Sequence, residues 1–190
     1  MSRVPVSPRL DPRFIERWSP VSFSPAAVDP RDLEAVLEAA RWAPSSNNDQ
    51  PWHLVVADRP ETVERARAVL VAGNRRWADR APVLILVFAR RLTRRNGTPN
   101  RWAAFDTGAA WMSMALQARS LGLITHAMGG FSAEQALALA GLSAESHEAL
   151  CVVALGHPGD GSELPEDLLV RQQPNGRLEL SEIVQRLGED

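Results

Sequence analysis

The chain has 190 residues, of which 45% are hydrophobic and 23% are charged, a composition typical of a globular protein with its own core. The formal net charge is −2 and no long run of one sign occurs, so we expect neither a nucleic-acid partner nor binding to an anionic membrane surface. The sequence contains no lysine and no tyrosine, which excludes Schiff-base catalysis by lysine and acid catalysis by tyrosine.

The N-terminal part of the chain contains many prolines and no long apolar stretch. We expect residues 1–12 to form an extended arm and residues 13–18 to contain the end of a short helix, before Pro20 and Pro25 turn the chain. No segment has the pattern of a signal peptide or the length of a membrane span, and Cys151 has no partner for an internal disulfide. These features predict a cytoplasmic protein.

Helices and strands follow along the first half of the chain. A helix is predicted over residues 29–43, with Asp29 as its N-cap, and Pro44 ends it. A strand is predicted over 53–57. The next predicted element is a helix over 60–73, with a glycine near its end.

The middle of the chain contains two strongly apolar elements. Residues 82–89 are a continuous apolar run, which predicts a strand covered on both faces. Residues 101–122 are the longest predicted helix and carry no charge between Asp106 and Arg119. A helix that is apolar on every side must be buried on every side. It is either a central core helix or a helix with one side against a second subunit.

The remaining elements are shorter. We expect Ser132 to cap a helix, with Gln135 at capping-box spacing, and Cys151 to lie in the core. The pattern predicts, in order, a strand over 123–128, a turn over 129–131, a helix over 132–142, a strand over 149–157 and a loop-rich extension over 160–190 with a short helix near its end. This order predicts one α+β or α/β domain over residues 1–190, built around a single sheet.

Several familiar catalytic motifs are absent from the sequence. The chain has no G-x-G-x-x-G after a strand, no phosphate-binding P-loop and no G-x-S-x-G nucleophile elbow. The four histidines are scattered, and none forms a pair at metal-ligand spacing, so we expect no metal site. An enzyme of this kind takes its chemistry from a cofactor.

Three polar segments indicate where a cofactor could bind. Residues 16–23 (ERWSPVSF) offer Arg17 and Ser19 to a phosphate or a carbonyl edge, although a surface helix end also explains them. Residues 41–52 (RWAPSSNNDQPW) offer more hydrogen-bonding side chains than a helix end needs, with turn chemistry as the alternative. The two glycines in 126–131 (HAMGGF) allow a flat ligand to approach the backbone, or simply form a tight turn.

Together these segments resemble the nitroreductase family of flavoproteins. The resemblance is carried, in chain order, by ERWSPVSF, VLEAARWAPSSNNDQPW, the N..WA..APVL pattern at 74–84, FDTGAAWMSMALQARSLGL and MGGF, and it covers nearly the whole chain. It implies an α+β homodimer with a central, mainly antiparallel sheet between helices. It also implies two FMN molecules at the subunit interface.

The resemblance assigns a set of FMN-binding residues. These are Arg17, Trp18, Ser19, Pro44, Ser45, Ser46, Asn48, Gln50, Asn74, Met128, Gly129, Gly130 and Arg177. The first three would contact the flavin and its phosphate side, and the C-terminal arginine would bind the phosphate. The loop 44–50 would reach the FMN of the other subunit, with Trp42 and Trp52 packed around it. Asn74 would lie near the pyrimidine edge of the flavin, and the backbone of 128–130 would face the flavin ring near N5.

Two positions depart from the family pattern. Many relatives carry a cation two residues after the serine of the first motif, where this chain has Val21. The C-terminal motif often carries a second basic residue, where this chain has Asn175, with Arg171 as a possible substitute. Both departures concern the affinity for FMN or its reduction potential.

The resemblance implies an oxidoreductase that takes hydride from NADH or NADPH onto flavin N5. A nitroaromatic, a quinone or a similar small acceptor would then be reduced in a ping-pong reaction, with no catalytic side chain required. The alternatives are a flavin-storage or sensor protein without turnover, a dimeric scaffold without flavin, and a flavin-dependent dehydrogenase or dehalogenase. Arg90, Arg91, Arg94 and Arg95 are candidates to contact the 2′-phosphate of NADPH, although a solvated loop is the simpler interpretation.

Overall fold

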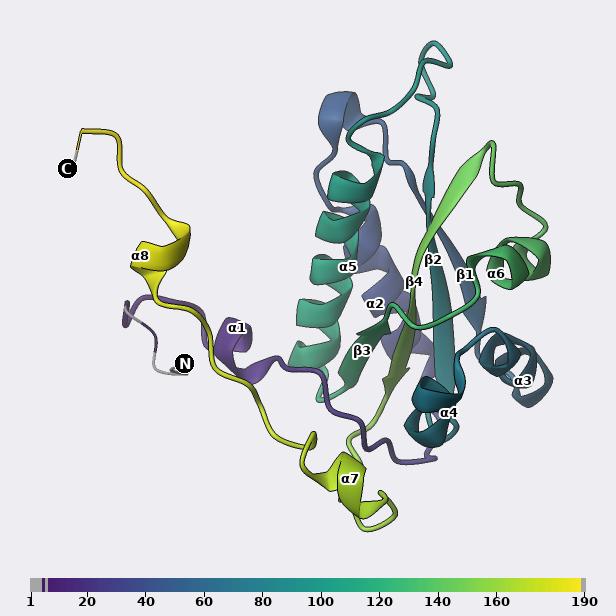
Figure 1. Ribbon diagram of the computed structural model, residues 1–190, viewed down its shortest axis with the longest axis vertical. Helices are drawn as coiled ribbons and strands as arrows, with labels where there is room; N and C mark the ends of the chain where they lie inside the picture. Colours follow the sequence, from purple (N-terminus) through teal and green to yellow (C-terminus); the bar gives the residue numbers. More distant parts are fainter. Residues whose placement is uncertain (1–4, 6, 189–190) are drawn as a thin grey trace.

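The centre of the molecule is an antiparallel sheet. The computed structural model describes residue 5 and residues 7–188. Residues 1–4 and 6 of the predicted N-terminal arm therefore lie outside the described residues. The four strands are hydrogen-bonded in the order β1 (Trp52–Ala57), β2 (Val83–Arg90), β4 (His147–Gly156) and β3 (Ile124–Met128) (Figure 1). The four predicted strands are therefore confirmed, and so is an α+β fold with a central antiparallel sheet.

Strand β2 lies in the middle of the sheet and is buried on both faces. It pairs with β1 on one side and with β4 on the other, and no residue from 83 to 89 is more than 3% exposed. Side chains alternate between the faces of a strand, so a strand covered on both sides must be apolar at every position. This explains the continuous apolar run that predicted the element.

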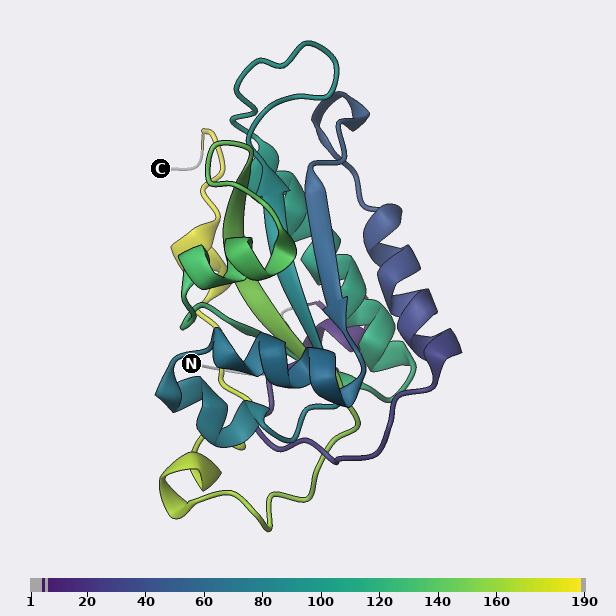
Figure 2. The same ribbon diagram turned by 90° about the vertical axis from the view of Figure 1, so that its right-hand side faces the viewer.

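Two layers of helices cover the sheet (Figures 1 and 2). On one face lie α2 (Pro30–Arg41) and α5 (Ala103–Ser120), packed on Val83, Ile85 and Val87. On the other face lie α3 (Pro60–Ala68), α4 (Ala72–Ala78) and α6 (Ala133–Ala140), packed on the alternate residues of the same strand. Each face of the sheet therefore has its own hydrophobic core.

The ends of two helices confirm the local predictions. The side chain of Asp29 accepts a 2.8 Å hydrogen bond from the backbone of Arg31, and a proline follows at the first position of α2. The hydroxyl of Ser132 accepts a 3.3 Å hydrogen bond from the backbone of Gln135, and α6 ends at Gly141 with a left-handed φ of 67°.

The prediction of one helix over residues 60–73 is wrong. Helix α3 ends at Ala68, a new helix α4 begins at Ala72, and Gly73 lies inside this second helix. Between them Leu70 forms a β-bridge with Phe131, so the backbone there bonds to a distant segment in place of its own helix. A tertiary contact of this kind overrides local helix propensity.

Helix α5 is not buried on every side within this chain. Ala110, Met114 and Ala118 face the core, whereas Phe105 is 76% exposed. The interpretation of α5 as a central core helix is therefore wrong.

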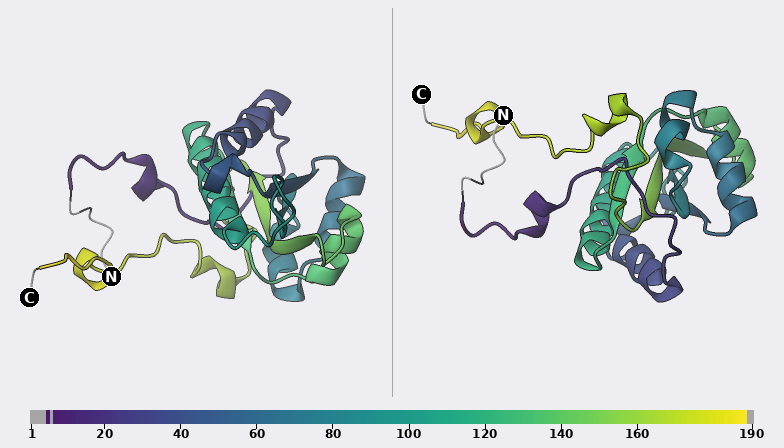
Figure 3. Two further views of the ribbon diagram at one scale, coloured as in Figure 1. Left: turned by 90° about the horizontal axis from the view of Figure 1, so that it is seen from above. Right: turned by 90° about the horizontal axis from the view of Figure 1, so that it is seen from below.

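The terminal segments leave the body of the protein on the side of α5 (Figure 3). They contain the short helices α1 (Arg13–Glu16), α7 (Glu166–Leu169) and α8 (Leu180–Ile183), of which α7 was not predicted. Residues of both segments line an apolar cavity of about 540 Å³ together with Trp111 and Met112 of α5. In the described part of the chain, no helix combines the length and the apolar character needed to cross a lipid bilayer.

Candidate cofactor-binding site

A polar pocket of about 340 Å³ lies between the segment after α1, strand β3 and the segment after α7. It is lined by Arg17, Trp18, Ser19, Val21, His126, Val170, Arg171, Gln173, Asn175 and Arg177. The lining contains three arginines and no acidic side chain. The structure thus brings together the first and the last of the residues that the resemblance assigns to the flavin phosphate.

His126 lies beside the arginines of this pocket. Its Nδ1 donates a 2.9 Å hydrogen bond to the carbonyl oxygen of Pro20, and its ring centre lies 4.4 Å from that of Trp77. Burial lowers the pKa of His126, and the charges of Arg171 and Arg17 lower it further. The imidazole is therefore neutral near pH 7, and the positive charge of the pocket comes from guanidinium groups.

The C-terminal segment is attached to the first motif by Gln172. Its Oε1 accepts backbone hydrogen bonds of 2.9 Å from Val21 and 3.2 Å from Ser22, and the Ser22 hydroxyl accepts one of 3.0 Å from Gly161. The side chain of Val21 is buried in the core, with 1% exposure. Arg171, the possible substitute for the second basic residue of the C-terminal motif, lies in the lining of this pocket together with Asn175.

The segment Met128–Gly130 begins at the last residue of β3 and is attached to α4. The side-chain amide of Asn74 donates a 2.9 Å hydrogen bond to the carbonyl oxygen of Gly130. Gly129 is exposed, and no heavy atom of the chain lies within 4 Å of the place where its Cβ would be. His126 and Met128 are two residues apart on one strand, about 7 Å, so this segment borders the polar pocket.

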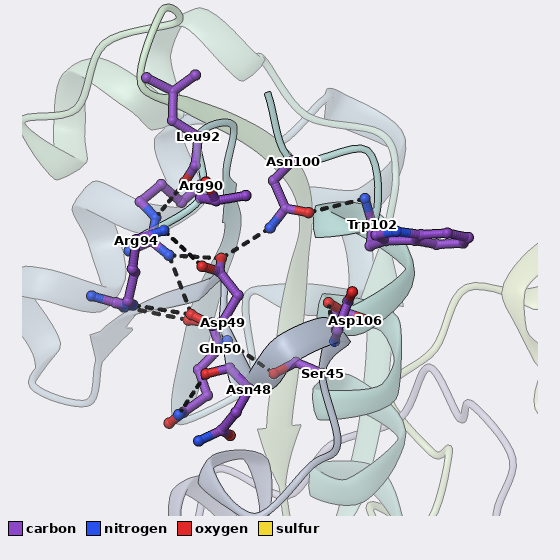
Figure 4. Close-up of polar contacts among 12 residues, drawn as sticks. Ser45, Asn48, Asp49, Gln50, Arg90, Leu92, Arg94, Asn100, Trp102 and Asp106 are labelled. Atoms are coloured by element: carbon purple, nitrogen blue, oxygen red, sulfur yellow. Dashed lines mark hydrogen bonds and ion pairs between the residues drawn. The ribbon is translucent and has the colours of Figure 1, made fainter. Parts of the chain in front are cut away.

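The loop 44–50 lies at the start of α5 (Figure 4). The backbone of Ser46 donates a 3.0 Å hydrogen bond to the buried carboxylate of Asp106, in the first turn of α5. The backbone of Gln50 donates a 2.9 Å hydrogen bond to the hydroxyl of Ser45. Asp49 is buried below the loop and is bonded to residues of the segment 90–100.

One chain does not bring all the assigned residues together. The loop 44–50 contacts Asp106 near the N-terminus of α5, whereas Glu16, next to the polar pocket, pairs with Arg119 in the last turn. Thirteen residues of helix separate these two contacts, about 20 Å at 1.5 Å per residue. The loop and the polar pocket thus lie at opposite ends of α5.

Two features near the loop have partners within the chain that the sequence did not predict. Trp42 does not pack around the loop of its own chain: it is 74% exposed, stacks on Arg41 at 4.9 Å and donates to Glu38. Two arginines of the cluster at the end of β2 are not simply solvated: Arg90 pairs with the Asp49 carboxylate, and the Arg94 guanidinium donates to the carbonyl oxygens of Asp49 and Gln50. These two cations therefore have a partner within the chain and are poor candidates for a 2′-phosphate contact.

The predictions from sequence did not include several residues of the site. His126 and Gln172 were not assigned, Asp49 was not recognised as the partner of Arg90, and Asn100 was not recognised as a partner of Asp49. A lone acidic residue in a neutral polar loop is the one local signal for Asp49. In the part of the chain that the structure describes, no three His, Cys, Asp or Glu side chains form a group that could hold a metal ion.

The fold and the pocket define an α+β protein with a cationic site suited to a phosphate-bearing ligand. A sequence profile of the Nitroreductase family matches residues 15–74 and 64–157. The chain therefore belongs to the nitroreductase family.

Individual relatives agree with this assignment. The chain is 36% identical over 124 residues to an uncharacterized 15.4 kDa protein of Mycolicibacterium smegmatis, covering 65% of this chain and 81% of that protein. It is 30% identical over 160 residues to an NADH dehydrogenase of Thermus thermophilus, covering 67% and 76% of the two chains. A solved structure of an oxidoreductase containing FMN superimposes with a TM-score of 0.89 at 35% identity, over 100% of this chain and 94% of that one.

Proposed function

We propose that this protein is an FMN-dependent oxidoreductase that takes electrons from NADH or NADPH and reduces a small acceptor, such as a nitroaromatic or a quinone. The observation that carries the proposal is the pocket with three arginines and no acidic residue, in a member of the nitroreductase family. The FMN-containing relative and the NADH dehydrogenase relative support it.

The residues of the pocket fit the phosphate end of FMN. Arg17, Arg171 and Arg177 offer guanidinium groups, which bind phosphate in a forked geometry, and Ser19 offers a hydroxyl. Neutral His126 adds no charge and holds the Pro20 carbonyl, which keeps the segment before Val21 in place. The open space beside Gly129 leaves room for a flat ring against the backbone of 128–130.

We further propose that the working site is formed by two copies of the chain. The loop 44–50 and the arginine pocket lie at opposite ends of α5, so loop residues of one copy would complete the pocket of the other. The exposed Phe105 face of α5 and the terminal segments that project past it supply the surface for such a homodimer. In this arrangement Ser45, Ser46 and Asn48 would offer hydrogen bonds to the FMN of the partner subunit.

FMN, when bound, supplies two-electron hydride chemistry, so the polypeptide needs no nucleophile of its own. The chain's own residues bind and orient: arginines neutralise the phosphate, backbone groups line the ring site, and the loop side chains offer hydrogen bonds. Such positioning and electrostatic roles are the usual contribution of a protein to cofactor chemistry.

The proposal is tested with the purified protein under anaerobic conditions. We expect a flavin absorption spectrum, either as purified or after adding FMN, and bleaching by NADH or NADPH. The preferred nucleotide follows from adding each in turn, and a nitroaromatic or a quinone should then restore the spectrum. Absence of FMN binding would refute the proposal. Bound FMN that neither nucleotide bleaches would support a flavin-binding protein without turnover.

The arginine pocket is tested by charge-neutral variants. Arg17→Gln and Arg171→Gln should each weaken FMN binding about ten- to hundredfold, because one charge-assisted hydrogen bond contributes about 1.5–3 kcal/mol. Arg65→Gln removes the same charge from an exposed position of α3 and should leave the dissociation constant unchanged. Equal affinities in all three variants would exclude this pocket as the phosphate site.

A further inference from the structure

The structure points to Asp49 as the positioning residue of the cofactor loop 44–50. We propose that its buried carboxylate holds this loop in the conformation that binds FMN, although Asp49 itself would not contact the cofactor. The inference rests on the proposed function, because the loop residues Ser45, Ser46 and Asn48 are proposed FMN contacts.

The backbone of the loop is not in its preferred conformation. Asn47, Asn48 and Gln50 have positive φ angles of 52°, 55° and 49°. The left-handed region costs a residue other than glycine roughly 1–2 kcal/mol of conformational free energy. Asparagine tolerates this region better than glutamine does. Three such residues within four positions require a set of contacts that holds them there.

Asp49 is the centre of those contacts (Figure 4). Its Oδ1 accepts a 2.6 Å hydrogen bond from the backbone of Arg94. Its Oδ2 accepts hydrogen bonds of 2.9 Å from the guanidinium of Arg90 and 2.9 Å from the amide of Asn100. The carboxylate side chain is only 7% exposed, so these three donors replace its water.

The same two arginines also hold the main chain of the loop, Arg94 through its side chain. The carbonyl oxygen of Asp49 accepts hydrogen bonds of 3.2 Å from Arg90 and 3.1 Å from Arg94, and Arg94 donates a further one of 3.3 Å to the carbonyl oxygen of Gln50. The Asp49 carboxylate therefore orients the guanidinium of Arg90 and holds the backbone of Arg94, whose own guanidinium bonds to the loop carbonyls. Its loss would weaken the backbone contacts as well as the side-chain contacts.

Asn100 extends the network to helix α5. Its Oδ1 accepts a 3.0 Å hydrogen bond from the backbone of Trp102, just before the helix, while its amide binds Asp49. Ser46 contacts Asp106 in the first turn of the same helix. The contacts through Asn100 and through Ser46 therefore fix the position of the loop relative to α5.

Within the loop, the anchoring residue is buried, whereas the side chains proposed to bind FMN are accessible. Among residues 44–50, all of which the structure describes, Asp49 alone is buried, whereas Ser45 and Ser46 are half-buried and Asn48 is exposed. The carboxylate thus faces inward, and the hydrogen-bonding side chains remain available to a ligand. A preorganised loop binds more tightly, because the ligand does not have to offset the entropy of ordering it.

The experiment compares Asp49→Asn with Asn100→Ala and a matched control. Asp49→Asn keeps the shape but removes the charge and replaces one acceptor by a donor, which then faces either the backbone N–H of Arg94 or the donors of Arg90 and Asn100. Asn100→Ala removes one donor and keeps the carboxylate. The control, Glu64→Gln, neutralises an exposed carboxylate that also pairs with two arginines, on α3.

The measured quantities are the dissociation constant of FMN, the visible circular dichroism of the bound flavin and amide hydrogen exchange of residues 44–50. They are taken at a temperature where all variants are fully folded. We expect the dissociation constant to rise at least tenfold in Asp49→Asn and by a smaller factor in Asn100→Ala. Faster exchange in the loop and an altered flavin dichroism should accompany both changes, with no change in Glu64→Gln.

The outcomes separate this inference from the proposed function. If the wild-type protein binds FMN and Asp49→Asn binds it equally well, Asp49 does not position the loop and the inference is overturned alone. A variant that is less stable yet binds FMN with unchanged affinity and dichroism has the same meaning, since Asp49 is then merely structural. If the wild-type protein binds no FMN, the proposed function and this inference are both refuted.

Discussion

Gly129 and Gly130 are adjacent, yet the structure gives them different roles that a pair of alanine substitutions can separate. A methyl group at Gly130 would lie 2.7 Å from Nδ2 of Asn74 and 2.9 Å from Cγ2 of Val71. At Gly129 no heavy atom lies within 4 Å of the added carbon. Neither glycine has a positive φ angle, so alanine can adopt both backbone conformations.

The size of the expected loss of stability in Gly130→Ala follows from these contacts. Asn74 cannot move away without losing its 2.9 Å hydrogen bond to the Gly130 carbonyl, and the branched side chain of Val71 has few alternative rotamers. Such overpacking lowers the free energy of unfolding by about 1–3 kcal/mol. A loss of about 2 kcal/mol lowers the melting temperature of a chain of this size by about 4–8 °C. Gly129→Ala should stay within about 0.5 kcal/mol of the wild type.

The assay is thermal unfolding of the FMN-free protein, followed by titration with FMN. Gly130→Ala should melt at the lower temperature. Gly129→Ala should melt with the wild type but bind FMN at least tenfold more weakly, because its methyl group occupies the space beside the proposed ring site. If Gly129→Ala melts as early as Gly130→Ala, or if Gly130→Ala is as stable as the wild type, the packing argument is wrong.

Three further predictions concern partly buried groups that can donate, accept or titrate. Gln172→Ala should remove the acceptor of two backbone N–H groups and make the segment after Gly161 more sensitive to protease, whereas Gln135→Ala on exposed α6 should not. Burial raises the pKa of Cys151 from 9.0 to about 11, so the thiol of the unfolded chain ionises before that of the folded chain as the pH rises. The free energy of unfolding, measured with urea, should therefore fall between pH 9 and 11 in the wild type. The fall should be smaller in Cys151→Ala. Burial lowers the pKa of His126 below 6.5, so the unfolded chain binds a proton at this imidazole before the folded chain does as the pH falls. The free energy of unfolding should therefore decline below pH 6.5. A smaller decline in the wild type than in His126→Gln would contradict the lowered pKa of His126.

Much of the fold could be predicted because it depends on local patterns. The apolar run of β2 needs only a strand with both faces covered, and Asp29 and Ser132 cap helices through contacts within three residues. The assigned residues Arg17 and Arg177 were found from the family resemblance, and the structure brings them into one pocket.

Other features could not be predicted because they depend on partners far along the chain. The break near Leu70 depends on Phe131, and the attachment of the C-terminal segment depends on Gln172 bonding to Val21, 151 positions away. The arginines after β2 have the composition of a solvated loop until the fold brings Asp49 beside them.

The sequence by itself determined the four strands, the capped helices α2 and α6, the two-faced burial of the central strand and the family, because periodicity, capping and motif spacing are recorded along the chain. The tertiary structure alone decided that the loop 44–50 is anchored by a buried carboxylate and that it lies about 20 Å along α5 from the contacts beside the arginine pocket. The physical reason is that a buried charge and a site divided between the two ends of a helix are defined by distances in space, which sequence separation does not encode.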